Sequence, residues 1–203
     1  MFGEIEWLFF DVGSTLVDES RANEHRIWDA IAGTDISYER AYARAAQLAA
    51  QNIAHPLKHL GLPVTPWHSE DEIVYPQAAD CLAALHGKYK IGIIANQNPG
   101  TAARMERYGL SRYLDLIIAS AEEGLEKPDP RIFELALKRA DCLPGHAVMI
   151  GDRLDNDILP AKRLGLKTIW IRQGFGGMGH PLAEMDTPDH CVNDLGELAE
   201  LLK

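Results

Sequence analysis

Apolar residues along the chain follow two patterns that alternate from Pro76 onward. Short apolar runs bounded by turn residues predict buried strands, at residues 7–10, 90–95, 114–119, 147–150 and 167–171. Apolar positions spaced three or four apart predict amphipathic helices, at residues 77–86, 99–108, 130–140, 157–164 and 194–203. Because such alternation is typical of a parallel sheet covered on both faces, we expect an α/β fold with a doubly wound parallel sheet.

A long stretch without strand character follows the first predicted strand. Residues 20–32 and 37–60 have the spacing of two amphipathic helices, and Ser37 can cap the second. Two prolines and a glycine in residues 61–66 then break the helical pattern. We therefore predict a core domain at 1–16 and 75–203 that carries a small all-helical cap at 17–74.

The charge balance makes the protein acidic. The 203 residues contain 20 Lys and Arg against 30 Asp and Glu, a net charge of −10 at pH 7. This balance disfavours a broad electrostatic grip on nucleic acid or on an anionic membrane, although a locally positive pocket can still take a small anionic ligand. We expect no nucleic acid and no membrane as partners, and the oligomeric state is left open.

Three cysteines, far apart and without a CxxC pair, favour a reduced setting over a disulfide framework or a zinc site. The first residues are acidic and lack the basic-then-apolar order of a signal peptide. No apolar run approaches the roughly 20 residues that a membrane helix needs. These features predict a cytoplasmic protein.

Polar side chains follow several of the predicted strands. Asp11 ends the first, Asn96 ends the second, Lys127 lies in the loop before the helix at 130–140, and Asp152 follows the strand at 147–150. Asp11 alone could equally cap the next helical turn. Carboxylates and an ammonium gathered at one sheet edge, however, describe a site for a divalent cation and an anion, and Mg²⁺ favours carboxylates together with phosphate oxygens.

These stretches resemble the four motifs of the haloacid dehalogenase (HAD) superfamily, in the same order and spacing. The matching residues are the run from Phe10 to Thr15, the strand end at Asn96, the segment Lys127–Pro130 and the acidic loop from Gly151 to Asp157. The resemblance covers residues 5 to about 172, and the insertion falls where that family places its first-type cap. It implies a sheet with strand 7–10 central, between strands 90–95 and 147–150.

The resemblance also implies a hydrolase, most plausibly a Mg²⁺-dependent phosphatase acting on a small phosphorylated metabolite. Asp11 would attack phosphorus to form an aspartyl intermediate that water hydrolyses. The ligands of Mg²⁺ would be Asp11, the main-chain carbonyl of Gly13 and Asp152, with Asp157 orienting them. Lys127 would pair with Asp11 and the phosphoryl group, as a catalytic residue. Substrate contacts would come from Thr15, Asn96 and Lys127.

The chain departs from that pattern at two positions. Phosphatases of the family carry a second Asp, the general acid and base, where this chain has Gly13, and a hydroxyl residue where it has Ala95. A positioned acid–base group is typically worth about 10²–10⁴ in rate. One hypothesis is that Asp18, Glu19 or His25, at the base of the insertion, replaces the missing acid. The alternative is a catalytically impaired protein that only binds a ligand or another protein.

A glycine-rich segment at residues 174–179 has the spelling of a dinucleotide-binding motif. That motif requires a helix opening on the glycines and an acid about 20 residues later, at the end of a second strand. His180 and Pro181 follow instead, close to the end of the sequence. We therefore expect a mobile loop after the last core strand.

Overall fold

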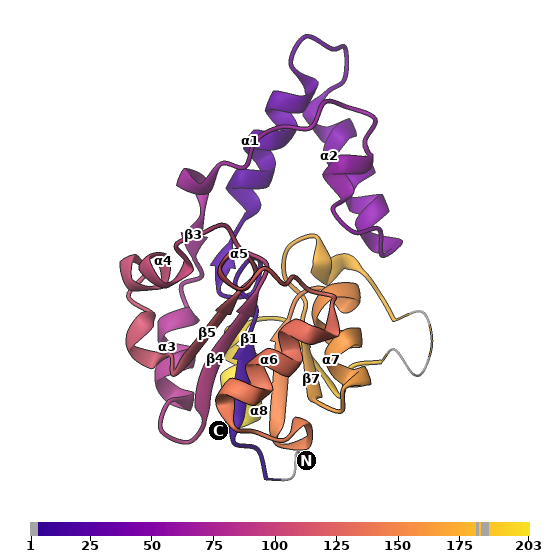
Figure 1. Cartoon of the computed structure of the whole chain (residues 1–203). Coiled ribbons are helices and arrows are strands. Elements are labelled where there is room, and N and C mark those ends of the chain that lie inside the picture. The colour runs from indigo at the N-terminus through magenta and orange to yellow at the C-terminus, as the bar shows by residue number, and fades with distance from the viewer. Residues whose placement is uncertain (1–3, 182, 184–186) are drawn as a thin grey trace.

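The computed structural model describes residues 4–181, 183 and 187–203. Among them, a six-stranded sheet forms the centre of the molecule (Figure 1). Its spatial order is β5-β4-β1-β6-β7-β8, and all five pairings are parallel. The strands are β1 (Trp7–Phe10), β4 (Lys90–Ala95), β5 (Leu116–Ala119), β6 (Ala147–Gly151), β7 (Lys167–Ile171) and β8 (His190–Val192). The expected parallel sheet with β1 between β4 and β6 is confirmed.

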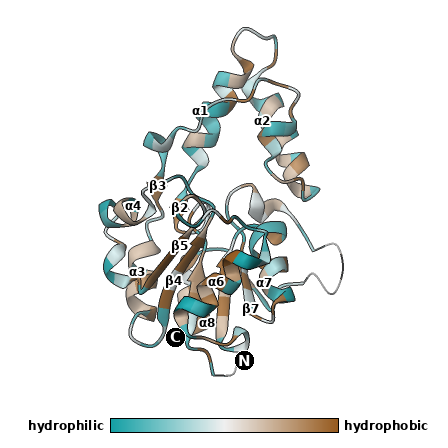
Figure 2. Ribbon diagram, viewed as in Figure 1, coloured by the Kyte–Doolittle hydropathy of each residue, from teal (hydrophilic) through white to brown (hydrophobic). Residues whose placement is uncertain are grey.

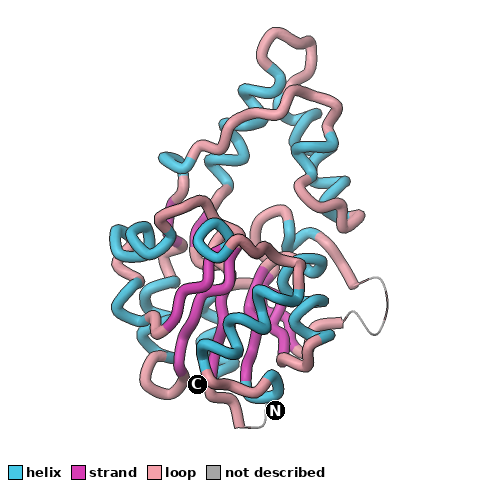
Figure 3. Tube along the Cα trace, in the orientation of Figure 1, coloured by secondary structure: helices cyan, strands magenta, loops and turns pink. Residues whose placement is uncertain are grey.

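Helices cover both faces of the sheet. Successive side chains of a strand point to opposite faces, so the apolar strands present apolar side chains on both sides. Leu8 and Phe10 of β1 point into one apolar cluster with α3 (Ala78–Leu85), α4 (Thr101–Arg107) and α8 (Leu195–Leu202). Phe9 packs on the opposite face against α6 (Pro130–Ala140) and α7 (Leu159–Arg163). Figures 2 and 3 show the apolar strands enclosed by these helices. The doubly wound arrangement is therefore confirmed, and within the described residues no helix is both long and apolar enough to cross a bilayer.

A helical segment rises from the sheet edge between two short antiparallel strands, β2 (Val17–Asp18) and β3 (Ile73–Val74). It contains α1 (Ser20–Ile31) and α2 (Tyr38–Ala50), which stand apart from the sheet (Figure 1). Its own small core includes Ile27, Ile31 and Ala41. The segment lies within the range predicted for the cap, and the division into domains at residues 17–74 stays a prediction.

The structure differs from the sequence prediction in two elements. The second helix of the insertion ends at Ala50 rather than near residue 60, because Asn52 and His55 adopt left-handed backbone conformations and Pro56 opens a separate 3-10 turn (Pro56–His59). Strand β8 was not predicted. It is only three residues long and includes a histidine and a cysteine, so its sequence lacks a strand signal.

Strand register brings the carboxyl ends of β1, β4 and β6 to one edge. Phe10 pairs with Ile93 on one side and Ile150 on the other. The Asp11 N–H then donates to the Ile150 carbonyl at 2.9 Å. Asp11 and the residues following β4 and β6 therefore leave the sheet together, at the edge where ligands of open parallel sheets bind.

We predict that Gly92→Ala destabilises the core. A Cβ on Gly92 would lie 2.7 Å from two ring carbons of Phe9, whose side chain is fully buried and has no room to move away. Overpacking of this kind costs about 1–3 kcal/mol, measurable by urea unfolding. The matched control is Gly145→Ala, because no atom outside its chain neighbours lies within 4 Å of the added Cβ. Equal midpoints for the two variants would contradict the prediction.

Candidate active site

The Lys127 side chain is fully buried between two carboxylates that are remote from it in sequence. Its Nζ donates to Asp11 Oδ1 and to Asp157 Oδ1, each at 2.6 Å. Burial lowers the pKa of Lys127, but the two carboxylates outweigh burial and hold that pKa above its ordinary value. Lys127 is therefore a permanently charged group at the end of β1.

Asp152 adds a third carboxylate to this group. One oxygen each from Asp11, Asp152 and Asp157 lie within 4.8 Å of one another. Burial, followed by the charges of Asp157 and Asp11, raises the pKa of Asp152 well above its usual range. Burial also raises the pKa of Asp157 to about 6, against the opposing effect of Lys127. An excess of buried carboxylates with oxygen as the only donor atom suits a hard divalent cation.

Neighbouring residues hold these groups in place through hydrogen bonds. The Trp170 indole donates to the Asp152 carbonyl at 2.6 Å, and the Arg153 N–H donates to Asp157 Oδ2 at 3.0 Å. Asn96 bonds the backbone of Lys127 twice, accepting from its N–H at 2.7 Å and donating to its carbonyl at 2.8 Å. Loops after three different strands are thereby fixed around one point.

Two residues expected to bind substrate lie close to this group. Thr15 is fully buried, its hydroxyl has no hydrogen-bond partner within the described residues, and it is not among the residues that line the cavity described below. The substrate contact expected of Thr15 stays a prediction. Asn96 lines the cavity, but both polar atoms of its amide hold Lys127. These two hydrogen bonds hold the backbone of Lys127 in place.

Glu19 occupies the space that a side chain at position 13 would need. A Cβ placed on Gly13 would overlap the Glu19 carboxylate. Glu19 Oε2 accepts a hydrogen bond from Ser14 Oγ at 3.1 Å. Burial, followed by the charge of Asp11, raises the pKa of Glu19 to about 7. Gly13, which appeared in the sequence as a lost acid, therefore makes room for an acid from the base of the insertion.

These groups lie in one cavity of about 560 Å³ between the sheet edge and the helical segment. Asp11, Glu19 and Asp152 form part of its floor, and residues of α1 and of the loops around residues 52–58 contribute to its walls. Such a volume is typical of a site for a small molecule. The arrangement can hold an anionic ligand with Asp11 and a proton-carrying carboxyl group close together.

A family model described as haloacid dehalogenase-like hydrolase matches residues 5–165. The chain belongs to this family. It is 30% identical to a glyceraldehyde 3-phosphate phosphatase of Pyrococcus furiosus, over 98% of this chain and 93% of the relative. It is 33% identical to a ribulose-1,5-bisphosphate 5-phosphatase of Halopiger xanaduensis, over 84% of this chain and 75% of the relative.

Solved structures support the fold of this HAD-like hydrolase. A predicted phosphoglycolate phosphatase from Haemophilus somnus superimposes with a TM-score of 0.71, over 99% of each chain, at 15% identity. At this identity the likeness concerns the fold alone. The expectation that the chain is a hydrolase of the HAD superfamily is confirmed by the family match.

The glycine-rich segment lies against the acidic group of the hydrolase. A Cβ on Gly176 would overlap the Asp152 carboxylate, and one on Gly174 would overlap the Ser14 side chain. The segment also contacts the insertion, because His180 and the Asn52 side chain exchange hydrogen bonds of 2.7 and 3.0 Å. The glycines therefore permit close approach to the site, and they do not form a dinucleotide-binding motif.

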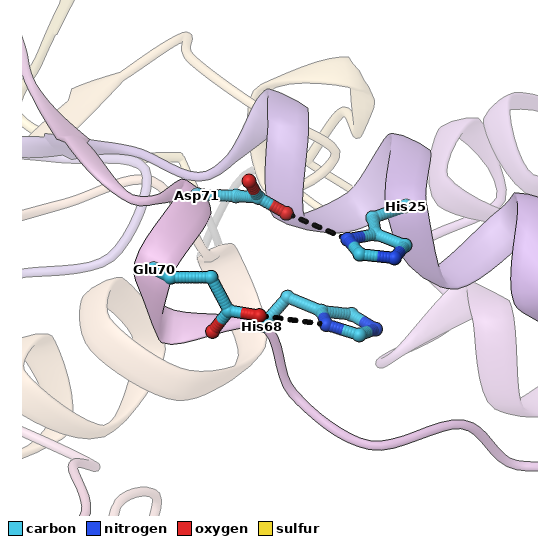
Figure 4. A group of neighbouring side chains, drawn as sticks. All are labelled: His25, His68, Glu70 and Asp71. Carbon is cyan, nitrogen blue, oxygen red and sulfur yellow. Dashed lines mark hydrogen bonds and ion pairs between the residues drawn. The ribbon is translucent and has the colours of Figure 1, made fainter.

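A second group with the residue types of a metal site lies on the helical segment (Figure 4). His25 of α1 and His68 stack at 3.5 Å between ring centroids and 10° between planes. His25 Nδ1 bonds Asp71 at 2.8 Å, and His68 Nδ1 bonds Glu70 at 3.1 Å. Parallel rings do not direct two nitrogen lone pairs at one point. We therefore interpret these four residues as a structural cluster, called the histidine cluster below, that holds α1 against the segment leading to β3.

These contacts distinguish Glu19 from Asp18 and His25, the other two residues considered as replacements for the missing Asp. Asp18 accepts hydrogen bonds from the N–H and hydroxyl of Ser20 at 2.8 and 2.6 Å, and His25 belongs to the histidine cluster. Glu19 is the one of the three that lines the cavity. The sequence could not distinguish them, because they are neighbours in sequence and only the turn geometry decides which one faces Asp11.

We predict that Glu19 makes the stability of the hydrolase depend on pH. Its folded-state pKa of about 7 lies above its ordinary value of 4.5, so its stabilising contribution is present below about 4.5 and is lost as the pH rises through 7. In the presence of a chelator, the free energy of unfolding should fall from pH 5 to pH 8 by on the order of 2–3 kcal/mol more in the wild type than in Glu19→Gln. Parallel pH profiles, measured by urea unfolding, would refute it.

Proposed function

We propose that this hydrolase is a Mg²⁺-dependent phosphatase that acts in the cytoplasm on a small phosphorylated metabolite, with Asp11 as the nucleophile. The observation that carries the proposal is the convergence of Asp11, Lys127, Asp152 and Asp157 at one end of a substrate-sized cavity. The two relatives described above, which are phosphatases of small sugar phosphates, support the same substrate class.

Asp11 has the environment that a carboxylate nucleophile needs. The ammonium of Lys127 holds an Asp11 oxygen at 2.6 Å and offsets negative charge on an incoming phosphoryl group. In the proposed reaction, an Asp11 oxygen bonds to phosphorus and the bond from phosphorus to the ester oxygen breaks. Water then attacks phosphorus, the acyl–phosphate bond breaks and inorganic phosphate leaves.

Glu19 is the proposed general acid and base of these two steps. Its carboxyl group fills the space above Gly13, beside Asp11, and faces the cavity. In the first step it gives a proton to the leaving oxygen of the alcohol, and in the second it takes a proton from the attacking water. This assignment removes the main objection to turnover, since the acid missing at position 13 is supplied from position 19.

Asp11, the Gly13 carbonyl and Asp152 are the proposed ligands of Mg²⁺, with Asp157 holding Lys127 behind them. The fit rests on the donor set, because buried carboxylates outnumber the one ammonium among them and all donors are oxygen. When bound, the ion would supply positive charge to the phosphoryl oxygens.

We predict that purified protein releases phosphate from at least one member of a panel of small phosphorylated metabolites when Mg²⁺ is present. Asp11→Asn, assayed in parallel, should show no turnover, because an amide is not a nucleophile of this kind. Phosphate release is followed colorimetrically with Mg²⁺ or with a chelator. Release that persists in Asp11→Asn would exclude the proposed nucleophile, and a wholly inactive panel would favour a binding protein.

We also predict that the acid can be moved between positions 19 and 13. Glu19→Gln should lower kcat about 10²-fold or more. Gly13→Asp alone should also be impaired, since the new side chain overlaps that of Glu19. The double variant Gly13→Asp/Glu19→Ala should be more active than either single variant, because the overlap is removed and one acid is retained.

The matched control is Glu24→Gln, on the exposed side of α1, which should leave kcat unchanged. An unchanged kcat in Glu19→Gln would remove Glu19 from the reaction. A double variant no better than its parents would show that the two positions are not equivalent.

A further inference from the structure

Two arginines line the cavity and form no hydrogen bond or ion pair with a carboxylate in the part of the chain that the structure describes. Arg26 comes from α1 of the insertion, and Arg104 comes from α4 of the core. The Nε atom of each is buried and has no hydrogen-bond partner within the described residues. Buried polar groups are nearly always satisfied, so two such donors beside one cavity call for an explanation.

Arg26 contacts the protein mainly through the face of its guanidinium group. Its Cζ lies 5.5 Å from the Trp67 ring centroid, a cation–π arrangement that orients the group. No guanidinium nitrogen of Arg26 forms a hydrogen bond or ion pair with the residues described. Burial lowers the pKa of Arg26, whereas the charge of Glu19 raises it. Arg26 therefore lines the cavity with guanidinium donors that no described residue uses.

Arg104 is only 9% exposed and uses one Nη2 donor on the Gln97 side-chain oxygen. That partner is neutral, so the buried charge is not compensated by it. Arg153, which also lines the cavity, shows the contrast, because it is paired with Asp155 at 2.6 Å. A buried guanidinium without a counter-charge is costly unless a ligand supplies one.

A chain of contacts connects the two arginines along one wall of the cavity. Arg26 lies over Trp67, the Trp67 indole donates to Glu72 at 2.7 Å, and the Tyr108 hydroxyl donates to the same carboxylate at 2.9 Å. Tyr108 in turn interacts electrostatically with Arg104. Both oxygens of Glu72 are thus engaged by neutral donors, and this carboxylate forms no ion pair with either arginine among the described residues.

We propose that Arg26 and Arg104 bind a second anionic group of the substrate, a carboxylate or a second phosphate, on the wall beyond Glu19. This inference rests on the proposed phosphatase function. The reacting phosphoryl group belongs beside Asp11 and Lys127, and Glu19 interacts with Asp11 and with Arg26. Arg26 is therefore close to the reacting group but separate from it, and Arg104 lines the same cavity. Together they select substrates with a second anionic group over singly phosphorylated ones of similar size.

The test compares matched substrates that differ only in the second charge. The carboxylate pair is 3-phosphoglycerate and glycerol 3-phosphate, and the phosphate pair is fructose 1,6-bisphosphate and fructose 6-phosphate. The wild type should favour the more anionic member of at least one pair by about tenfold or more in kcat/KM. The pair that shows the preference identifies the second group as a carboxylate or a phosphate.

Arg26→Gln and Arg104→Gln should each reduce this preference, the ratio of kcat/KM within a pair, about fivefold or more. Arg26→Lys should keep part of it, because it keeps the charge. Arg44→Gln, on the exposed side of α2, is the matched control and should keep all of it. Equal kcat/KM within both pairs, or a preference that survives both Gln variants, would overturn the inference.

Binding to Asp11→Asn, measured by calorimetry, separates this inference from the proposed function. Tighter binding of the more anionic member without any turnover by the wild type would reject the phosphatase and retain the anion site. Turnover of both members without any difference in binding or kcat/KM would retain the phosphatase and reject the anion site. Failure of every compound to bind or react would reject both.

Discussion

The burial of the Lys127 ammonium between Asp11 and Asp157 is the constraint on which the site depends. An unpaired lysine in this position would be expensive, and so would two unpaired carboxylates. Each partner therefore requires the others, although they come from distant parts of the sequence. The parallel sheet satisfies this requirement by ending β1 and β6 at one edge, and Asn96 after β4 secures the loop that carries Lys127. The fold and the site are thus stabilised together.

A missing side chain shapes the neighbourhood of this ion pair. Gly13 leaves a space beside Asp11 that no larger residue would leave, and the Glu19 carboxylate enters it. The close approach of Gly176 to Asp152 on the other side follows the same logic. Small residues at these two points let groups from the insertion and from the loop after β7 reach the acidic group. The cavity is therefore assembled from segments that are far apart in the sequence, around one buried charge network.

The sequence predicted the features that depend on the spacing of apolar residues and on the order of the elements along the chain. The alternation of strands and helices predicted the sheet, and polar residues at strand ends predicted the convergence of Asp11, Lys127 and Asp152. It could not predict which residue fills the space at Gly13, because Asp18, Glu19 and His25 can all transfer protons and their positions in the sequence do not show which side chain faces Asp11. Arg26 and Arg104 carried no signal either, since an arginine in an amphipathic helix is ordinarily solvated.

Glu19 immediately precedes the first residue of α1 and is its N-terminal cap position, so it is attached to the helical segment as well as to the nucleophile loop. A displacement of α1 relative to the sheet would therefore move this carboxyl group relative to Asp11. An acid at position 13 would stay beside Asp11 whatever the position of the helical segment. In the proposed mechanism, enclosure of the ligand and delivery of the proton are one event, and displacement of the helical segment would remove the group that protonates the leaving oxygen.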